Sequence, residues 1–267
     1  NARTKECDSM PILRVENLHF SYGKKEVLKG LNFSVFESKV IGIIGSNGSG
    51  KTTLLKNISG YLKPTFGNIF IEDRNIRELS IKEKARYISY VPQDIRCDFE
   101  FTCYDIVMMG RMPFLRRFQP ERKEDKDIVR KCMEMTNTWQ FRDTMINQLS
   151  GGEKQRVYIA RALAQEPKIL LMDEPISHLD IKYQIEILSF VRELAKQGIL
   201  VIAVLHDINL ACQFCNEILI MKDGRIMDLG RPNKVITPKS IKSAFSIDVD
   251  LIENPKNNIP DVVASIV

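Results

Sequence analysis

The chain has 267 residues, of which 44% are hydrophobic and 27% are charged, and its formal net charge is +5. This composition is typical of a globular protein with one large domain or two smaller ones, and the mild positive charge does not by itself indicate a nucleic-acid partner. The longest apolar runs, such as residues 199–205, are far shorter than the roughly 20 residues that a membrane-spanning helix requires. We therefore expect a membrane role only through a partner.

Residues 1–10 lack the apolar stretch of a secretory signal, and we interpret them as a leader or an expression remnant on a cytoplasmic protein. The cysteines stand at positions 7, 97, 103, 132, 212 and 215, and only the last two form a C-x-x-C pair. A zinc site needs four ligands, and no second pair is near in the sequence. We predict that Cys212 and Cys215 are small buried side chains rather than metal-binding or redox groups.

Strand signals dominate the first part of the chain. Alternating or continuous apolar segments predict strands at residues 12–18, 31–36, 39–45, 68–72 and 87–91. The segment K-V-I-G-I-I-G at residues 39–45 is almost entirely apolar, which is typical of a strand buried on both faces. From residue 95 to residue 147 the strand signals stop, and helices are predicted at residues 102–110 and 120–138, the second with Pro120 at a first helical position.

Helix and strand signals alternate again after residue 148. Helices are predicted at residues 153–164 and 181–196, and strands at residues 168–173, 199–205, 217–221 and 225–229. The last segment is a polar-rich tail with short helical pieces. The predicted organisation is a leader (1–10), an α/β core in two parts (11–94 and 148–230), an inserted helical subdomain (95–147) and a C-terminal tail (231–267).

The stretch G-S-N-G-S-G-K-T, residues 45–52, fits the pattern G-x-x-x-x-G-K-[ST] and lies between an apolar strand and a predicted helix. Glycines in this pattern let backbone N–H groups surround a phosphate. Lys51 is expected to reach the outer phosphates, Thr52 to offer its hydroxyl to Mg²⁺, and Thr53 to bond an inner phosphate. The predicted phosphate-binding residues are Gly45, Ser46, Asn47, Gly48, Ser49, Gly50, Lys51, Thr52 and Thr53.

The apolar run I-L-L-M-D-E-P, residues 169–175, contains two carboxylates at the end of a predicted strand. Asp173 can supply an oxygen ligand to Mg²⁺. Glu174 can polarise a water molecule for in-line attack on a γ-phosphate. A strand that ends in Asp-Glu is a weak signal alone, but together with the phosphate loop it indicates phosphoryl-transfer chemistry.

A second glycine turn occurs in L-S-G-G-E-K-Q, at the start of a predicted helix. Ser150 and Glu153 fit a capping box, which would be a purely structural feature. A cap does not require Gly151 and Gly152, which lower helix propensity, and their exposed N–H groups suit an anion. The residues alone leave the structural interpretation open, but the exposed N–H groups of the two glycines are better explained by a phosphate.

With the phosphate loop upstream and the D-E-P segment downstream, L-S-G-G-E-K-Q closely resembles the signature of the ATP-binding-cassette ATPases, and the resemblance covers roughly residues 12–247. It implies an α/β fold: a P-loop NTPase (RecA-like) core with an antiparallel β subdomain and an inserted α-helical subdomain. It also implies ATP as substrate, Mg²⁺ as cofactor and a head-to-tail dimer. In that dimer the signature residues of one chain face the ATP of the other: Ser150, Gly151, Gly152 and Glu153.

The same resemblance implies roles for four further residues. Tyr22 in F-S-Y-G matches the aromatic residue that stacks on adenine, and Gln93 in Y-V-P-Q-D matches the glutamine that contacts Mg²⁺ or the attacking water. Asp180 in S-H-L-D matches a loop that crosses the dimer interface, and His206 in L-H-D matches a histidine that reaches the γ-phosphate. The catalytic residues implied are Lys51, Gln93, Glu174 and His206, and the Mg²⁺ residues implied are Thr52, Gln93 and Asp173.

Four stretches with less distinctive residues bear on the biological role. Residues 101–114, 174–181, 205–226 and 230–245 resemble the ATPase subunits of importers for iron chelates, haem and cobalamin. This resemblance implies separate membrane permease subunits, an extracytoplasmic substrate-binding protein, a location at the cytoplasmic face of the cell membrane and no nucleic-acid partner. We expect residues 96–116 to dock the membrane subunit, with Met109 and Arg111 in the contact.

Two alternatives share the nucleotide motifs. A soluble ATP-binding-cassette ATPase of iron–sulfur cluster assembly would have the same phosphate loop and signature. An importer could also carry an oxyanion such as molybdate instead of a metal chelate. The single cassette, and the lack of a long heptad insertion between Gln93 and Ser150, argue against the translation-factor and DNA-repair types.

Overall fold

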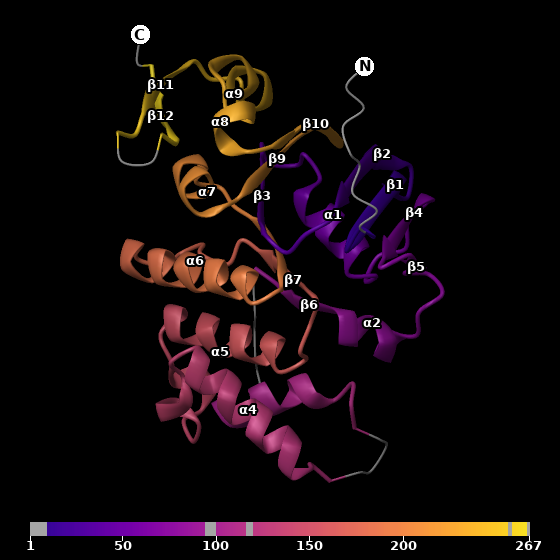
Figure 1. Cartoon of the computed structure of the whole chain (residues 1–267), viewed down its shortest axis with the longest axis vertical. Helices are drawn as coiled ribbons and strands as arrows, with labels where there is room; N and C mark the ends of the chain where they lie inside the picture. Colours follow the sequence, from indigo (N-terminus) through magenta and orange to yellow (C-terminus); the bar gives the residue numbers. More distant parts are fainter. Residues whose placement is uncertain (1–9, 94–99, 116–119, 256–257, 266–267) are drawn as a thin grey trace.

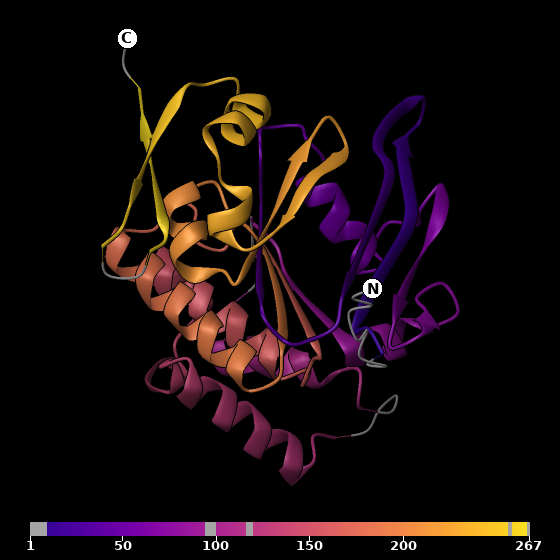
Figure 2. The ribbon, with the colours of Figure 1, turned by 45° about the horizontal axis from the view of Figure 1, so that its top comes forward.

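The computed structural model describes residues 10–93, 100–115, 120–255 and 258–265 (Figure 1). Within these residues the strands form a four-stranded antiparallel sheet, a six-stranded mixed sheet and a two-stranded hairpin. One helix packs between the two larger sheets, and other helices cover the opposite face of the six-stranded sheet (Figures 1 and 2). No helix in the described ranges is long and apolar enough to cross a membrane.

The antiparallel sheet has the strand order β2-β1-β4-β5. Its strands are β1 (Leu13–Tyr22), β2 (Lys25–Val35), β4 (Phe66–Ile71) and β5 (Arg74–Asn75). Alternate residues of β1, such as Leu13 and Val15, are buried in one cluster with the apolar side chains of α1 (Lys51–Ile58). β2 begins at Lys25 rather than at residue 31, because its polar first half pairs with β1.

The central sheet has the strand order β10-β9-β3-β8-β7-β6. Every neighbouring pair is parallel except the β9–β10 hairpin at one edge. β3, β7 and β8 are buried at every position, as their apolar runs predicted, because both faces of the sheet are covered. The bounds are β3 (Val40–Gly45), β6 (Ile88–Val91), β7 (Ile169–Asp173), β8 (Leu200–Val204), β9 (Glu217–Lys222) and β10 (Arg225–Gly230).

The face of the central sheet opposite α1 is covered by α5 (Gly151–Leu163), α6 (Ile181–Lys196) and α7 (Ile208–Phe214). Between β6 and α5 the described chain is helical, with α3 (Cys103–Met108), η1 (Met109–Arg111), α4 (Lys123–Met135), η2 (Trp139–Phe141) and η3 (Ile146–Gln148). The prediction that Pro120 begins a helix was wrong. α4 begins at Lys123, because the Asp125 carboxylate accepts the backbone N–H of Arg122 and caps the first turn there.

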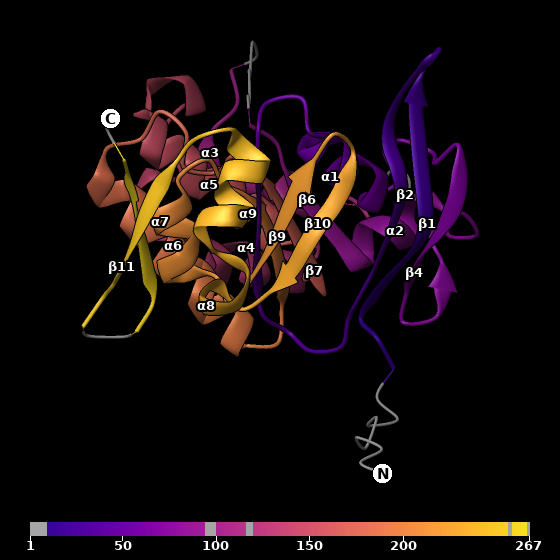
Figure 3. The same cartoon turned by 90° about the horizontal axis from the view of Figure 1, so that it is seen from above.

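The C-terminal segment contains α8 (Pro232–Val235), α9 (Pro238–Phe245), β11 (Val249–Glu253) and β12 (Pro260–Ala264). The β11–β12 hairpin was not predicted, because both strands are short and carry charged residues. Figure 3 shows it beside α7. The Asn209 side chain of α7 joins the two elements, since its amide donates to the carbonyl oxygen of Val262 at 3.2 Å and accepts the N–H of Val262 at 2.7 Å.

Cys212 and Cys215 are both buried, as predicted. Burial raises the pKa of each thiol to about 12, so both are protonated at neutral pH. A Cβ atom at Gly42 of β3 would lie 2.7 Å from the sulfur of Cys215. The glycine therefore allows the end of α7 to pack directly on the central sheet.

A buried ion pair joins two parts of the helical segment, η1 and α4, to the end of α5. Arg111 is 3% exposed and Asp125 is fully buried, and the Arg111 Nε and Asp125 Oδ1 atoms are 3.0 Å apart. The same guanidinium donates to the carbonyl oxygen of Ala164 at 2.7 Å and to the Glu166 carboxylate at 2.8 Å. Burial opposes ionisation of Asp125, but hydrogen bonds from Arg122 and Arg111 outweigh it and hold the pKa of Asp125 below its ordinary value.

Residues 113–115 form a short strap that joins the helical segment to α2 (Ile81–Tyr87), the helix that precedes β6 in the chain. Lys82 Nζ donates to the carbonyl oxygen of Leu115 at 2.8 Å, and Arg86 Nη2 donates to the carbonyl oxygen of Pro113 at 3.2 Å. The Phe114 ring lies 5.2 Å from the Arg86 guanidinium and 4.1 Å from the guanidinium of the buried ion pair. These distances are within the range of cation–π interactions.

Replacement of Arg111 tests the structural role of the ion pair. Arg111→Met leaves the buried Asp125 carboxylate without one of its partners, and we expect the free energy of unfolding to fall by about 3 kcal/mol in denaturant titrations. Arg130→Met is the control, because its pair with Glu134 is exposed and should contribute less than about 0.5 kcal/mol. Equal losses for the two variants would contradict the role assigned to Arg111.

Candidate active site

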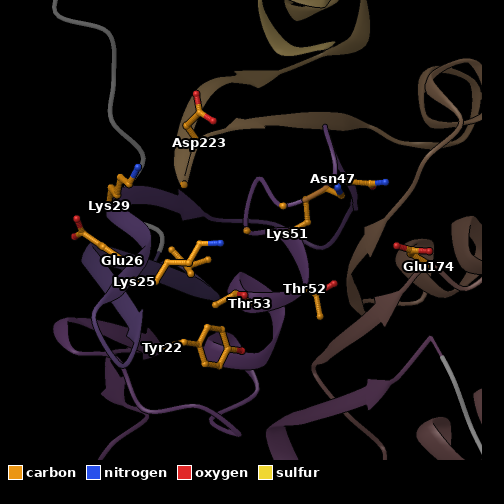
Figure 4. A pocket seen from close by; sticks show the side chains of 14 residues that line it. Tyr22, Lys25, Glu26, Lys29, Asn47, Lys51, Thr52, Thr53, Glu174 and Asp223 are labelled. Atoms are coloured by element: carbon orange, nitrogen blue, oxygen red, sulfur yellow. The ribbon is translucent and has the colours of Figure 1, made fainter. Parts of the chain in front are cut away.

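A pocket of about 840 Å³ opens where the start of β2, the loop between β3 and α1, and the β9–β10 turn meet (Figure 4). The predicted site residues that line it are Tyr22, Asn47, Gly48, Gly50, Lys51, Thr52, Thr53 and Glu174. Tyr22 lies at one end, half-exposed, with its ring packed edge-to-face on Phe20. Glu174 lies at the far side of the loop, so the pocket extends from an aromatic ring to a carboxylate.

The loop between β3 and α1 depends on backbone conformations that suit glycine. Gly45 has φ +153°, and a Cβ atom there would lie 2.2 Å from the carbonyl oxygen of Met221. Gly50 has φ +103° and stands at the N-cap of α1, where no side chain caps the helix. The N–H groups of the first turn and the positive end of the helix dipole therefore face the pocket, which suits an anion.

Lys51 is the buried cation of this loop, with 6% of its surface exposed. Its ammonium group donates to the carbonyl oxygens of Gly45 at 2.8 Å and Ser46 at 3.0 Å. An ammonium has three N–H donors, so one remains for a phosphate oxygen. Burial lowers the pKa of Lys51, and the charges of Glu174 and Asp173 counteract that lowering. Ser46 thus contributes through its backbone.

Asp173 ends β7 as a buried carboxylate held from both sides. Thr52 Oγ1 donates to Asp173 Oδ1 at 2.9 Å, and the Tyr90 hydroxyl donates to Asp173 Oδ2 at 2.9 Å. Burial and the charge of Asp173 raise the pKa of Tyr90, which keeps this hydroxyl protonated. The structure therefore brings together Thr52 and Asp173, two of the three residues expected to hold Mg²⁺.

Glu174 follows directly and adopts φ +49°, an uncommon conformation for a residue other than glycine that recurs at functional sites. Its Oε2 atom accepts hydrogen bonds from Gln93 Nε2 at 2.6 Å and from Ser177 Oγ at 3.1 Å. Its Oε1 atom lies 2.5 Å from His206 Nε2. Three of the four residues expected to be catalytic are thus in direct contact, and the fourth, Lys51, lies in the same pocket.

Within one chain, the second glycine turn forms the capping box of the structural interpretation. Ser150 is the N-cap of α5, and its hydroxyl and its backbone N–H both donate to the Glu153 carboxylate, at 2.6 and 2.9 Å. Gly152 has a packing role, since a Cβ atom there would lie 3.0 Å from the Tyr183 ring of α6. Gly151 is exposed. None of these signature residues lines the pocket of its own chain.

Some features of the site were not predicted from the sequence. Tyr90 and Ser177 hold the two carboxylates, but a tyrosine inside a strand or a serine after a turn carries no distinctive signal. Lys25 and Asp223 line the pocket from two hairpins outside every motif. Asp180 is the N-cap residue of α6, yet its exposed side chain makes no capping hydrogen bond.

Removal of the Tyr90 hydroxyl tests how firmly the site holds Asp173. Tyr90→Phe leaves one oxygen of a carboxylate that is 2% exposed without its donor, so we expect the free energy of unfolding to fall by about 1–3 kcal/mol. Tyr87→Phe is the matched control, because the Tyr87 hydroxyl accepts a long 3.4 Å bond from Arg74 at an exposed position. Denaturant titrations that give the same loss for both variants would contradict this role of Tyr90.

Comparisons with known proteins agree with this geometry. A family model described as "ABC transporter" matches residues 28–177. An uncharacterized ABC transporter ATP-binding protein of Methanocaldococcus jannaschii is 40% identical over 96% of this chain and 98% of its own length. The ferric enterobactin transport ATP-binding protein FepC of Escherichia coli is 35% identical over 96% of this chain and 95% of its own length.

Among solved structures, an inward-facing conformation of a metal-chelate type ABC transporter matches with a TM-score of 0.84 and 27% identity, over 96% of this chain and 98% of that chain. These likenesses confirm the predicted α/β fold of the P-loop NTPase type and the predicted family. The phosphate loop, the Asp-Glu pair and the signature all lie within the matched region. The chain therefore belongs to the ABC transporter family and is one of its ATP-hydrolysing subunits.

Proposed function

We propose that the chain powers an importer that takes up a metal chelate of the iron–siderophore, haem or cobalamin type through separate membrane subunits. The observation that carries the hydrolytic part is the position of Glu174 beside the phosphate-loop pocket, in contact with Gln93 and His206. The importer part is supported by FepC, named for ferric enterobactin transport, and by the structure described as a metal-chelate type transporter.

ATP would occupy the pocket with its base on Tyr22 and its terminal phosphates over the phosphate loop. The uncapped first turn of α1 and the remaining N–H donor of Lys51 would bind phosphate oxygens. Tyr22 offers an exposed ring face for stacking. The pocket has polar groups at one end and an aromatic ring at the other, which fits a nucleoside triphosphate.

The residues near Asp173 fit Mg²⁺, a hard cation that prefers oxygen ligands. Thr52 Oγ1 and Asp173 Oδ1 lie 2.9 Å apart at the end of the phosphate loop, and these two residues would hold the ion, with Gln93 as a further ligand. Held there, Mg²⁺ would supply positive charge that stabilises the charge developing on the phosphate oxygens.

Glu174 would orient and polarise the water that attacks the γ-phosphate. Both of its carboxylate oxygens are held, one by His206 and the other by Gln93 and Ser177, so its position is set before substrate binds. Gln93 follows β6 and His206 follows β8, so residues after two different strands hold Glu174. Most of the rate enhancement would come from such positioning and from charge stabilisation.

Two copies would act head to tail. Ser150 and Gly151 are exposed, do not line the pocket of their own chain, and stand at the N-terminus of a 13-residue helix. Such a helix end suits the γ-phosphate of a partner's ATP. The exposed Asp180 side chain at the start of α6, which makes no capping hydrogen bond, would lie at the same dimer interface.

Glu174→Gln tests the hydrolytic assignment. The amide keeps the size of the side chain but cannot accept a proton, so kcat should fall at least about 100-fold. The Kd for ATP should stay within about twofold, because Glu174 is not needed to hold the phosphates. Steady-state ATPase assays and nucleotide titrations measure the two quantities, with Glu186→Gln on α6 as a surface control. An unchanged turnover number would overturn the assignment.

Of the docking surface expected at residues 96–116, the contact of Arg111 was wrong, because this side chain is buried in the ion pair described above. The contact of the half-buried Met109 stays a prediction, and residues 96–99 and 116 lie outside the described residues. A groove of about 480 Å³ lies nearby, next to α2, with Tyr61 80% exposed and Ile81 86% exposed at its wall. Met112, 65% exposed, precedes the strap that contacts α2.

We assign this groove to a short amphipathic helix of the permease subunit. Tyr61 and Ile81 line one groove together, which gives a partner helix a shared apolar contact, and Lys84 adds a polar rim. Tyr90, which holds Asp173, also lines the groove. A helix bound there would therefore lie one side chain away from the nucleotide site. This arrangement suits a partner whose motion is coupled to hydrolysis.

Ile81→Glu tests the groove against a matched exposed isoleucine. A buried carboxylate would weaken the complex, so capture of a polytopic membrane protein from detergent-solubilised native membranes should fall at least about tenfold. Ile252→Glu, at a position 57% exposed on β11, should leave capture unchanged. Full capture by Ile81→Glu would exclude the groove, and recovery of soluble iron–sulfur assembly proteins alone would support that alternative function.

The permease and an extracytoplasmic binding protein would select the individual chelate within this class. The relatives reported above do not favour an iron–sulfur assembly role or an oxyanion cargo such as molybdate. The proposed location is the cytoplasmic face of the membrane, where the permease would hold the chain as a peripheral subunit.

A further inference from the structure

We propose that Lys25 binds the α-phosphate of the nucleotide, an inference that rests on the nucleotide pocket proposed above. Lys25 is the first residue of β2 and lies outside every motif of the phosphate site. It lines the same pocket as Lys51, from the opposite wall. The antiparallel sheet would thus bring Lys25 to the nucleotide in addition to the Lys51 of the phosphate loop.

The register of the hairpin sets the position of Lys25. Tyr22 and Lys25 are direct partners in the β1–β2 ladder, with Gly23 and Lys24 forming the turn between them. Side chains of directly opposed residues point to the same face of a sheet. The lysine therefore stands beside the ring proposed to stack on the base. Lys24, one residue earlier, is exposed and does not line the pocket.

The ammonium group of Lys25 is available for a ligand. In Figure 4 its side chain points into the space between Tyr22 and the phosphate loop. Within the described ranges it forms no hydrogen bond or ion pair. The neighbouring carboxylate of Glu26 is 2.8 Å from His19 Nδ1, so it is already occupied by another residue. Lys25 thus offers this wall an ammonium group that has no ion-pair partner among the described residues.

The chemistry of ATP decides which group Lys25 would contact. The terminal phosphates belong at the N-terminus of α1 and the base on Tyr22, so the ribose and the α-phosphate lie between them. Of these two groups only the phosphate is anionic. An ammonium is a compact point charge with donors and no acceptor, which favours a phosphate oxygen over the hydroxyls of a sugar. Thr53 would face the same phosphate from the other wall.

The test compares Lys25→Met with Lys24→Met, which removes the same charge one residue away. The Kd of ATP, 2′-deoxy-ATP and GTP is measured by calorimetric titration at fixed ionic strength. We expect Lys25→Met to raise all three values by the same factor of about five to ten, and Lys24→Met to change them less than twofold. Lys25→Arg, which keeps the charge, should stay within about threefold of the unaltered chain.

The outcomes separate this inference from the pocket itself. An unchanged Kd in Lys25→Met, an equal effect of Lys24→Met, or a factor that differs between ATP and either analogue would overturn the α-phosphate contact. Lys51→Ala is titrated in parallel. If it weakens ATP binding while Lys25→Met does not, the pocket stands and only the role of Lys25 fails. If neither variant weakens binding, the proposed pocket fails as well.

Discussion

The site depends on one constraint of the central sheet: parallel strands end at the same edge. Four neighbouring parallel strands deliver the residues of the site there. The phosphate loop follows β3, His206 follows β8, the Asp-Glu pair ends β7, and Gln93 follows β6. Residues separated by more than a hundred positions in the chain are thereby in hydrogen-bond contact, and the apolar interiors of the strands hold that edge rigid.

The sequence predicts this edge well for a physical reason. Strands buried on both faces must be apolar throughout, so β3, β7 and β8 are visible as continuous runs, and the polar residues that follow them stand out. The phosphate loop adds glycines that its geometry requires, as the close approach of Met221 to Gly45 illustrates. Each of these residues follows a strand whose apolar run is visible in the sequence, so the local pattern also predicts where the residue lies in the fold.

Other features escape prediction because they depend on register or on tertiary partners. Lys25 reaches the pocket only because it pairs with Tyr22 across β1 and β2, and no local sequence pattern indicates that pairing. Arg111 looks like a surface residue until its partner Asp125 is found on another helix. The β11–β12 hairpin depends in the same way on Asn209, a side chain of another element. The start of α4 escaped prediction for a local reason, because the cap comes from Asp125 and not from one of the usual residues at the N-cap position.

The strap between α2 and the helical segment has a consequence for how this surface can diversify. Its two polar bonds end on main-chain carbonyl oxygens, at Pro113 and Leu115, rather than on side chains. Every amino acid supplies such a carbonyl, so positions 113 and 115 can change without loss of these bonds, whereas the ring at Phe114 cannot. The side chains next to the proposed groove can therefore differ from one transporter to another while the backbone keeps the same path.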